Sequence, residues 1–315
     1  CYLGITNDSF PEINQDKKYI LQNINSVKKF YKPKLIGIEN IGLTCAWRRL
    51  DRKNWSKMLK ILIKEMNSNG VLKLILNDDK NKNALSELMI MKLITDIDEA
   101  AVDDEVKIIV IASLGNVFCS GHNLKEITNA RKSDDKGQKY FKNLFNSCSS
   151  LMQMIVNCPK PVIAEVNGIA TAAGCQLVAS CDLAFASDIS RFATPGVNIG
   201  LFCSTPMVAL SRNVNKKHAM KMLLTGDMIN ADEAKRISLI NDFYQEKDLS
   251  EAVMALAEKI ASKPMMTLNN GKQAFYKQYE MHLIDAYNYT SKVMANNALK
   301  DDAKEGIASF LEKRK

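Results

Sequence analysis

Two short stretches of small residues could place backbone N–H groups around one oxygen atom. The first is "FCSGHNL" (118–124), and the second is "NGIATAAGCQ" (167–176). Each follows an apolar run typical of a strand and precedes a pattern typical of a helix, so free N–H groups face whatever lies there. Two such turns on neighbouring strands could direct two donors to one developing oxyanion, the chemistry of an oxyanion hole. Close packing of a helix on a sheet is the alternative explanation for either turn alone.

The same region offers few side chains for acid–base or nucleophilic chemistry. Gln176 ends the second stretch, and its amide can hold a water molecule but has no useful basicity near neutral pH. His122 titrates near neutrality, and two interpretations stay open: the ring acts as acid or base, or it points away and only its N–H is used. Cys203 and Ser204 have no visible partner base, so neither is expected to act as a nucleophile.

The elements that must position these turns are short apolar runs that alternate with helical patterns. Expected strands cover residues 71–78, 106–113, 161–167 and 181–187. Expected helices cover residues 84–101 and 137–158 and, after the last strand, residues 215–226, 230–239, 248–262 and 266–279. This alternation predicts an α/β fold with largely parallel strands. The helical tail is of a kind that often packs on a neighbouring subunit.

The first part of the chain differs in composition from the rest. Residues 1–68 contain 13 Lys and Arg against 6 Asp and Glu, which accounts for nearly all of the formal net charge of +8. Residues 45–66 carry the pattern of a basic amphipathic helix. Two interpretations of this N-terminal extension are kept, a mitochondrial transit segment and a solvated, disordered extension.

Composition excludes several classes of function. The chain is 46% apolar and 25% charged, as is ordinary for a soluble globular protein, and no apolar run approaches the roughly 20 residues of a membrane span. The body beyond residue 68 is close to neutral, so no nucleic-acid-binding face is expected. The 8 cysteines form no CxxC pair, which indicates a reducing compartment, and the 3 scattered histidines give a metal site little support.

The two turns together resemble those of the enoyl-CoA hydratase/isomerase (crotonase) superfamily. The likeness runs from about residue 70 to the C-terminus and includes "CDLAFAS" (181–187), "FATPGVNIGLFCSTP" (192–206) and "LLTGDMINADEAKRISLIN" (223–241). It implies a crotonase-type spiral of ββα units with a C-terminal helical trimerisation region. The expected parts are the extension over residues 1–68, a crotonase core over 69–260 and the C-terminal helices over 261–315.

In this family the thioester carbonyl of an acyl-CoA lies between two backbone N–H groups, which the resemblance assigns to His122 and Ala173. It also implies acyl-CoA contacts at Lys82, Ser120, Gly121, Gly174, Cys203, Ser204, Phe310 and Lys313, the last two from a neighbouring subunit. The CoA thioester would be substrate or ligand, with no separate cofactor and no metal. The family assembles as trimers, commonly paired into hexamers. With the cationic extension, the resemblance implies fatty-acid metabolism in the mitochondrial matrix.

The chain departs from the family where the family's hydratases carry two glutamates. The first glutamate falls on Gln176 and the second on Gly196. Positioned acid–base groups typically contribute about 10²–10⁴-fold to a rate, so ordinary hydration is not expected. Two hypotheses stay open: an enoyl-CoA hydratase/isomerase-like lyase with unusual acid–base groups, and a catalytically inactive acyl-CoA-binding or regulatory protein.

Two further polar residues in these motifs are interpreted as structural. Asn123 stands where the family usually has an aspartate, and we expect it to cap the following helix. Asp182 begins "CDLAFAS" (181–187), and we expect it to be a carboxylate paired within the fold and not a base.

Overall fold

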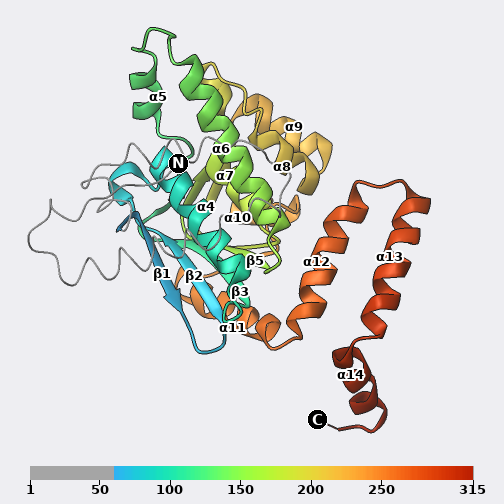
Figure 1. The fold of residues 1–315 in the computed structure, drawn as a ribbon. Helices are drawn as coiled ribbons and strands as arrows, with labels where there is room; N and C mark the ends of the chain where they lie inside the picture. The colour runs from blue at the N-terminus through green and yellow to red at the C-terminus, as the bar shows by residue number, and fades with distance from the viewer. Residues whose placement is uncertain (1–59, 315) are drawn as a thin grey trace, which may run out of the picture. The chain divides into compact units, whose positions relative to one another are not determined.

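The computed structural model describes residues 60–314, and a six-stranded sheet forms the centre of this part of the chain (Figure 1). Its strands, in spatial order, are β1 (Leu62–Met66), β2 (Val71–Leu76), β3 (Ile108–Ser113), β5 (Val162–Val166), β7 (Leu183–Ser187) and β10 (Asp242–Tyr244). Strands β2 to β10 run parallel to one another, and β1 pairs antiparallel with β2. The expected α/β fold with parallel pairing is confirmed.

The middle strands of this sheet are covered on both faces, which explains their continuous apolar sequences. In β3, Ile108 and Val110 pack with α11 (Glu246–Ala261), whereas Ile109 and Ile111 face the larger core. Helices α4 (Glu87–Val102) and α6 (Gln138–Asn157) lie on that second side. A parallel sheet buried in this way favours β-branched residues without alternation of polar ones.

A second, smaller sheet consists of strands that are too short to be recognised in the sequence. It contains β4 (Val117–Cys119), β6 (Ile169–Thr171), β8 (Arg191–Ala193) and β9 (Ile229–Asn230). Strands β3, β5 and β7 of the large sheet are each followed directly by one of β4, β6 and β8, and then by helix. This repeated strand–strand–helix order is the expected spiral of ββα units.

The end of the basic helix expected over residues 45–66 is a strand instead. Residues 62–66 form β1, in register from Leu62 opposite Leu76 to Met66 opposite Leu72. The turn to β2 is closed by the Asn67 side chain, whose Oδ1 accepts from the Val71 N–H at 2.9 Å. A short apolar run is compatible with a helix or with a strand, and here the pairing with β2 makes it a strand. The extension expected through residue 68 therefore does not include β1, and its residues 1–59 lie outside the described residues.

The remaining helices connect and cover these sheets. They are η1 (Asp79–Asn81), α5 (Leu124–Ala130), α7 (Ala173–Ser180), η2 (Pro195–Ile199), α8 (Pro206–Asn213), α9 (Lys216–Thr225), α10 (Ala231–Arg236), α12 (Met265–Tyr279), α13 (Leu283–Ala298) and α14 (Asp301–Leu311). Each helix expected after residue 210 is present within a few residues of its expected ends. Between residues 60 and 314, none of the helices is long and apolar enough to cross a lipid bilayer.

The last three helices, α12 to α14, form what we call the C-terminal arm. Helix α12 buries Ala274, α13 buries Ala286, and α14 buries no residue. Large apolar side chains of the arm face outward: Phe275, Tyr279, Leu283, Ile284, Tyr287, Met294, Leu299, Ile307, Phe310 and Leu311. The arm thus leaves much apolar surface exposed in the single chain.

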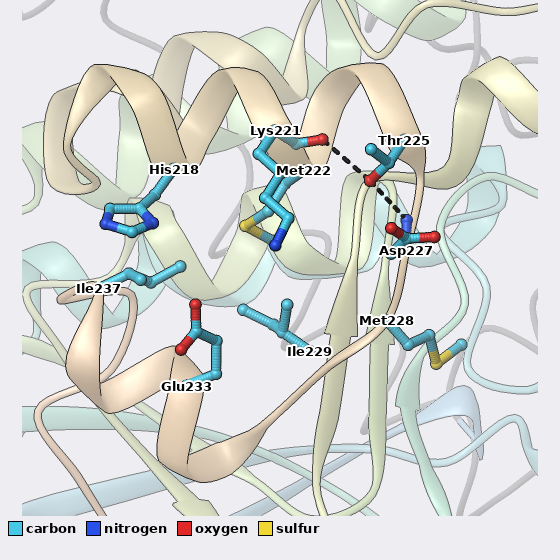
Figure 2. A pocket seen from close by; sticks show the side chains of 9 residues that line it. All are labelled: His218, Lys221, Met222, Thr225, Asp227, Met228, Ile229, Glu233 and Ile237. Carbon is cyan, nitrogen blue, oxygen red and sulfur yellow. Dashed lines mark hydrogen bonds between the residues drawn. The ribbon is translucent and has the colours of Figure 1, made fainter.

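Helices α9 and α10 flank an open hollow of about 440 Å³ (Figure 2). Its wall comprises His218, Lys221, Met222, Thr225, Asp227, Met228, Ile229, Glu233 and Ile237. None of the residues singled out in the sequence lines it. The wall carries both signs of charge, from Lys221 and from Asp227 and Glu233.

Candidate functional site

The two glycine turns lie against each other. Gly121 has a φ of +88°, and a Cβ atom there would stand 2.8 Å from the Ala172 Cβ and 3.3 Å from the Ala173 nitrogen. A left-handed backbone without a side chain is therefore required at Gly121 for this approach. Segments 51 positions apart along the chain, residues 121 and 172, are brought into contact at the start of helix α7.

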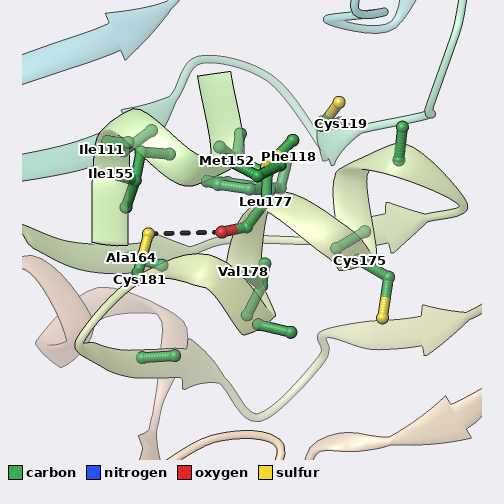
Figure 3. Close-up of a cluster of buried hydrophobic side chains, with 14 of the residues drawn as sticks. Ile111, Phe118, Cys119, Met152, Ile155, Ala164, Cys175, Leu177, Val178 and Cys181 are labelled. Atoms are coloured by element: carbon green, nitrogen blue, oxygen red, sulfur yellow. Dashed lines mark hydrogen bonds between the residues drawn. The ribbon is translucent and has the colours of Figure 1, made fainter. Parts of the chain in front are cut away.

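Helix α7 is seated directly on strand β4. A Cβ atom at Gly174 would lie only 2.2 Å from the Cys119 carbonyl oxygen, so no larger residue fits there. All eight residues of α7 are buried, and Figure 3 shows Cys175, Leu177 and Val178 surrounded by apolar side chains. A helix buried on every side holds its N-terminus rigidly, which is what a site built from backbone groups needs.

The N–H groups of His122 and Ala173 are both free to donate. Neither donates to an acceptor anywhere in residues 60–314. Ala173 is the first residue of α7, and the preceding Ala172 adopts φ 52° and ψ −118°, an unusual backbone for alanine. The Ala172 N–H donates to the Ala193 carbonyl at 2.9 Å, which fixes the peptide between Thr171 and Ala172, one residue before the Ala173 N–H.

The loop before α4 supports the first turn from the other side. The Ser120 N–H donates to the Lys82 carbonyl at 3.2 Å, and the Leu85 N–H donates to the Gly121 carbonyl at 2.8 Å. Lys82 therefore lies beside the first turn. Its backbone is left-handed, and its exposed ammonium group lies 3.1 Å from the Asp79 carboxylate.

Asn83 organises this loop, and sequence reasoning missed it. Its side chain is fully buried, accepts from the Asp78 N–H at 2.7 Å, and donates to the carbonyls of Leu114 and Val117 at 3.0 and 2.7 Å. Its φ of 50° is one that asparagine tolerates better than most residues. The signal available in the sequence was an asparagine directly before an apolar helix pattern.

The imidazole ring of His122 contacts residues outside the two turns. Nδ1 lies 3.3 Å from the Leu85 carbonyl, and the ring packs edge-on against Phe145 of α6, with 5.4 Å between centroids. Nε2 is buried and has no partner among the described residues. Burial lowers the pKa of His122, so the neutral ring with a proton on Nδ1 is the favoured form. This geometry favours the interpretation in which only the N–H of His122 serves the site.

Gln176 is a buried amide, with 4% of its surface exposed. Its Oε1 atom is buried and has no partner within the part of the chain that the structure describes. One turn further along, Ser180 donates to the Gln176 backbone carbonyl at 2.8 Å, not to the side chain. A buried amide oxygen without a partner is a costly arrangement, and such groups often mark functional positions.

Gly196 lies where no side chain can be accommodated. A Cβ atom there would lie 2.5 Å from the Leu201 carbonyl oxygen and 2.9 Å from the Cys203 sulfur. The segment is held in this position because the Leu201 N–H donates to the Gly196 carbonyl at 2.9 Å. A glutamate at position 196 therefore requires the segment from residue 196 to residue 203 to move.

Cys203 and Ser204 do not form a nucleophilic site. Cys203 is buried, and burial raises the pKa of its thiol, which disfavours the reactive thiolate. Ser204 is exposed, and its hydroxyl donates to the Phe202 carbonyl at 3.4 Å. Among residues 60–314, no group of three or more His, Cys, Asp or Glu side chains could hold a metal ion.

Three further predicted residues have clear positions. Asn123 caps α5, with its Oδ1 accepting from the Lys125 N–H at 3.0 Å, as expected. Phe310 lies in α14 and is 82% exposed, and Lys313, just beyond α14, is exposed as well. Helix α14 packs on α13, so these two residues belong to the outer end of the C-terminal arm.

Comparisons with known proteins agree with this fold and these motifs. The family model for enoyl-CoA hydratase/isomerase matches residues 66–315. A Xenopus laevis protein, enoyl-CoA hydratase domain-containing protein 3, mitochondrial, is 49% identical over 246 residues, covering 78% of this chain and 82% of that protein. The human protein of the same name is 48% identical over 246 residues, with coverage of 78% and 80%.

Solved structures give the same picture. The crystal structure of the human enoyl-CoA hydratase domain-containing protein 3 superposes with a TM-score of 0.77 at 46% identity, covering 81% of this chain and 98% of that one. An enoyl-CoA hydratase from Mycobacterium smegmatis gives a TM-score of 0.77 at 44% identity, with coverage of 81% and 97%. The chain therefore belongs to the enoyl-CoA hydratase/isomerase family and has the crotonase fold.

Proposed function

We propose that this protein binds acyl-CoA thioesters, with the thioester oxygen accepting hydrogen bonds from the N–H groups of His122 and Ala173. The observation that carries the proposal is the contact between the two turns, in which a Cβ atom at Gly121 would lie 3.3 Å from the Ala173 nitrogen. Both N–H groups lack an acceptor in the described part of the chain. The hydratase names of the relatives support a CoA thioester as the ligand.

Such a pair of donors has a defined chemical effect. Each donor stabilises negative charge that develops on the thioester oxygen, by roughly 2.7–4 kcal/mol in well-studied oxyanion holes. Since both donors belong to the backbone, the identities of the side chains at 122 and 173 matter less than the backbone path. No cofactor beyond the CoA thioester is needed for this binding.

We further propose that the protein does not hydrate enoyl-CoA at an appreciable rate. Gln176 offers an amide in place of the first family glutamate, and Gly196 offers only backbone in place of the second. The tight packing of Gly196 against the Leu201 carbonyl leaves no space for another side chain to take its role. The neutral ring of His122 is directed to Leu85, which leaves it poorly placed to act as the missing base.

The setting of this activity is also proposed. The close relatives are named as mitochondrial, and we propose fatty-acid metabolism in the matrix as the context. The exposed apolar side chains of the C-terminal arm support self-association as a trimer or hexamer. In such an assembly Phe310 and Lys313 of one subunit would contact the acyl-CoA of another.

Titration with acyl-CoA, together with an assay of enoyl absorbance, tests the proposal. The wild-type protein is expected to bind crotonyl-CoA and longer enoyl-CoAs in the micromolar range without consuming them. Ala173→Pro removes one donor at the first position of a helix, but the Ala172 backbone, at φ 52° and ψ −118°, is strained before a proline, so circular dichroism first checks that the variant folds. The substitution is expected to weaken binding by at least about tenfold. Leu124→Pro removes the first N–H of exposed helix α5 and serves as the control.

Each result decides between the two hypotheses kept from the sequence. Turnover well above background would establish the enzyme hypothesis and overturn the absence of hydration. Absence of binding to any CoA thioester would overturn the proposed function altogether. Equal affinities of wild type and Ala173→Pro, with both folded by circular dichroism, would remove Ala173 from the site.

A further inference from the structure

We infer that Lys272 is a positioning residue: through Asp182 it fixes the C-terminal arm to the core in the orientation that acyl-CoA binding requires. The part of this inference that concerns the ligand rests on the proposed function above. The part that concerns attachment of the arm rests on contacts within the chain alone. Neither residue touches the two glycine turns.

The ammonium group of Lys272 has all three of its donors engaged. It donates to the carbonyls of Ile155 and Lys160, both at 3.0 Å, and to Asp182 Oδ2 at 2.7 Å. Only 7% of the Lys272 side chain is exposed. A lysine buried to this extent on an otherwise exposed helix is unusual, and full satisfaction of its donors explains why it is stable there.

Asp182 joins the arm to the sheet. Its Oδ2 also accepts from the Val162 N–H at 2.6 Å, at the start of β5, and its Oδ1 accepts from the Tyr276 hydroxyl at 2.9 Å. Burial and the charge of Asp182 both raise the pKa of Tyr276, so the phenol remains a donor. Lys272 and Tyr276 are four residues apart on α12 and therefore share one helix face.

Among residues 60–314, the polar side-chain links between the arm and the core are this buried cluster and one exposed ion pair, Arg212 with Glu280 at 3.4 Å, and exposed pairs contribute little. Within α12 to α14, the residues that become buried are two alanines, Ala274 and Ala286. Alanine side chains remove little apolar area from water, so they give α12 little preference for one direction. Directional bonds to a buried carboxylate supply that preference, because they are lost when the helix turns or slides.

The polar cluster lies at the amino ends of the parallel strands, whereas the candidate site lies at their carboxyl ends. Asp182 precedes β7 and Val162 begins β5, whereas the two glycine turns follow the carboxyl ends of β3 and β5. A five-residue strand spans roughly 16 Å at about 3.3 Å per residue, so Asp182 does not reach the thioester site. Its carboxylate is paired with Lys272 and Tyr276, as the structural interpretation of Asp182 predicts. Any effect of Lys272 on ligand binding must therefore pass through the arm.

Hydrogen exchange read by mass spectrometry, combined with acyl-CoA titration, tests the inference on the full chain. Lys272→Met keeps a long side chain and removes the charge. We expect exchange in peptides from residues 265–311 to rise at least about tenfold, with peptides from β3 and β5 unchanged. Acyl-CoA affinity is expected to fall by at least about tenfold. Lys263→Met makes the same charge change at an exposed lysine without an ion pair in residues 60–314, and is expected to behave as wild type.

A double-mutant comparison separates positioning from general stability. If Lys272 acts through Asp182, adding Asp182→Asn to Lys272→Met is expected to cause little further loss of affinity or protection. Equal exchange of the arm in wild type and Lys272→Met overturns the inference, and so does a rise that is as large in β3 as in the arm. If the wild type binds no acyl-CoA, the proposed function and the ligand part of the inference fail, while exchange still decides whether Lys272 attaches the arm.

Discussion

Gly121 and Ala173 meet so closely that a single methyl group added at position 121 would lie 3.3 Å from the Ala173 nitrogen. This one contact joins the end of the first strand–strand unit to the start of the helix in the second. It places the turn that contains His122 against the start of α7, where Ala173 lies, as the proposed pair of backbone donors requires.

Gly121→Ala is expected to weaken acyl-CoA binding by at least about tenfold and to destabilise the fold. The new methyl group would meet the Ala172 Cβ at 2.8 Å and force the two turns apart. Gly200→Ala is the matched control, because Gly200 also has a positive φ of +75° but has no atom within 4 Å of the Cβ position. The control isolates the backbone cost, about 1–2 kcal/mol. Denaturant unfolding and ligand titration measure both effects, and unchanged binding in Gly121→Ala would contradict the site.

Restoring the two family glutamates is expected to fail at position 196. Gly196→Glu places a Cβ atom 2.5 Å from the Leu201 carbonyl, and overpacking of this kind typically costs about 1–3 kcal/mol. Gln176→Glu alone should fold and bind, with at most slow hydration of crotonyl-CoA. Thermal unfolding and the enoyl absorbance assay check both variants. A stable double variant with fast turnover would show that the segment from 196 to 203 shifts readily.

Replacing His122 by glutamine is expected to change how stability depends on pH. Burial lowers the pKa of the His122 ring, so below about pH 6.5 the unfolded chain takes up a proton that the folded chain resists. Wild-type stability should therefore be fully present above that pH and fall as the pH decreases, with a slope of up to about 1.4 kcal/mol per pH unit. The His122→Gln variant lacks this contribution. The prediction is wrong if the free energies of unfolding of the two proteins change with pH by the same amount between about pH 7 and pH 5.

Asn83→Ala is expected to be among the most damaging single changes in the core. It leaves the Leu114 and Val117 carbonyls and the Asp78 N–H without their side-chain partner, at a cost of about 1–3 kcal/mol for each group left unsatisfied. The same loop positions the Lys82 carbonyl, which accepts from the Ser120 N–H of the first turn. Ligand affinity should therefore fall as well. Asn81→Ala is the control for urea unfolding and titration, because Asn81 is partly exposed and its side chain donates only to the Asp78 carboxylate of the same loop.

Much of the large sheet could be predicted because its buried strands β2, β3, β5 and β7 are largely apolar runs of five or six residues. The long helices α4 and α6 between them show an apolar pattern at helical spacing. The small sheet could not be predicted, because strands of two or three residues such as β9 have no period and exist only through their neighbours. Strand β1 has five residues, as β5 does, but its sequence LIKEM also continues the helical pattern before it, and pairing with β2 decides its conformation.

The candidate site could likewise be predicted only in part. The small residues around Gly121 and Ala173 suggested two backbone donors, because glycine and alanine before a helix are visible in one sequence. The role of Asn83 depends on carbonyl groups more than 30 residues away, at Leu114 and Val117, and an asparagine before an apolar helix pattern does not reveal these partners. The closed surroundings of Gly196 depend on the path of residues 201–203, which a motif does not encode.

Strand β1 also sets a limit on how far the N-terminal part of the chain can be removed. It occupies the outer edge of the large sheet and presents Lys64 and Glu65, and charged side chains on an edge strand discourage pairing with other molecules. Cleavage beyond Leu62 would instead uncover β2, whose sequence VLKLIL is nearly all apolar, with its hydrogen-bonding groups unpaired. Any proteolytic maturation that leaves a non-aggregating protein must therefore stop before Leu62.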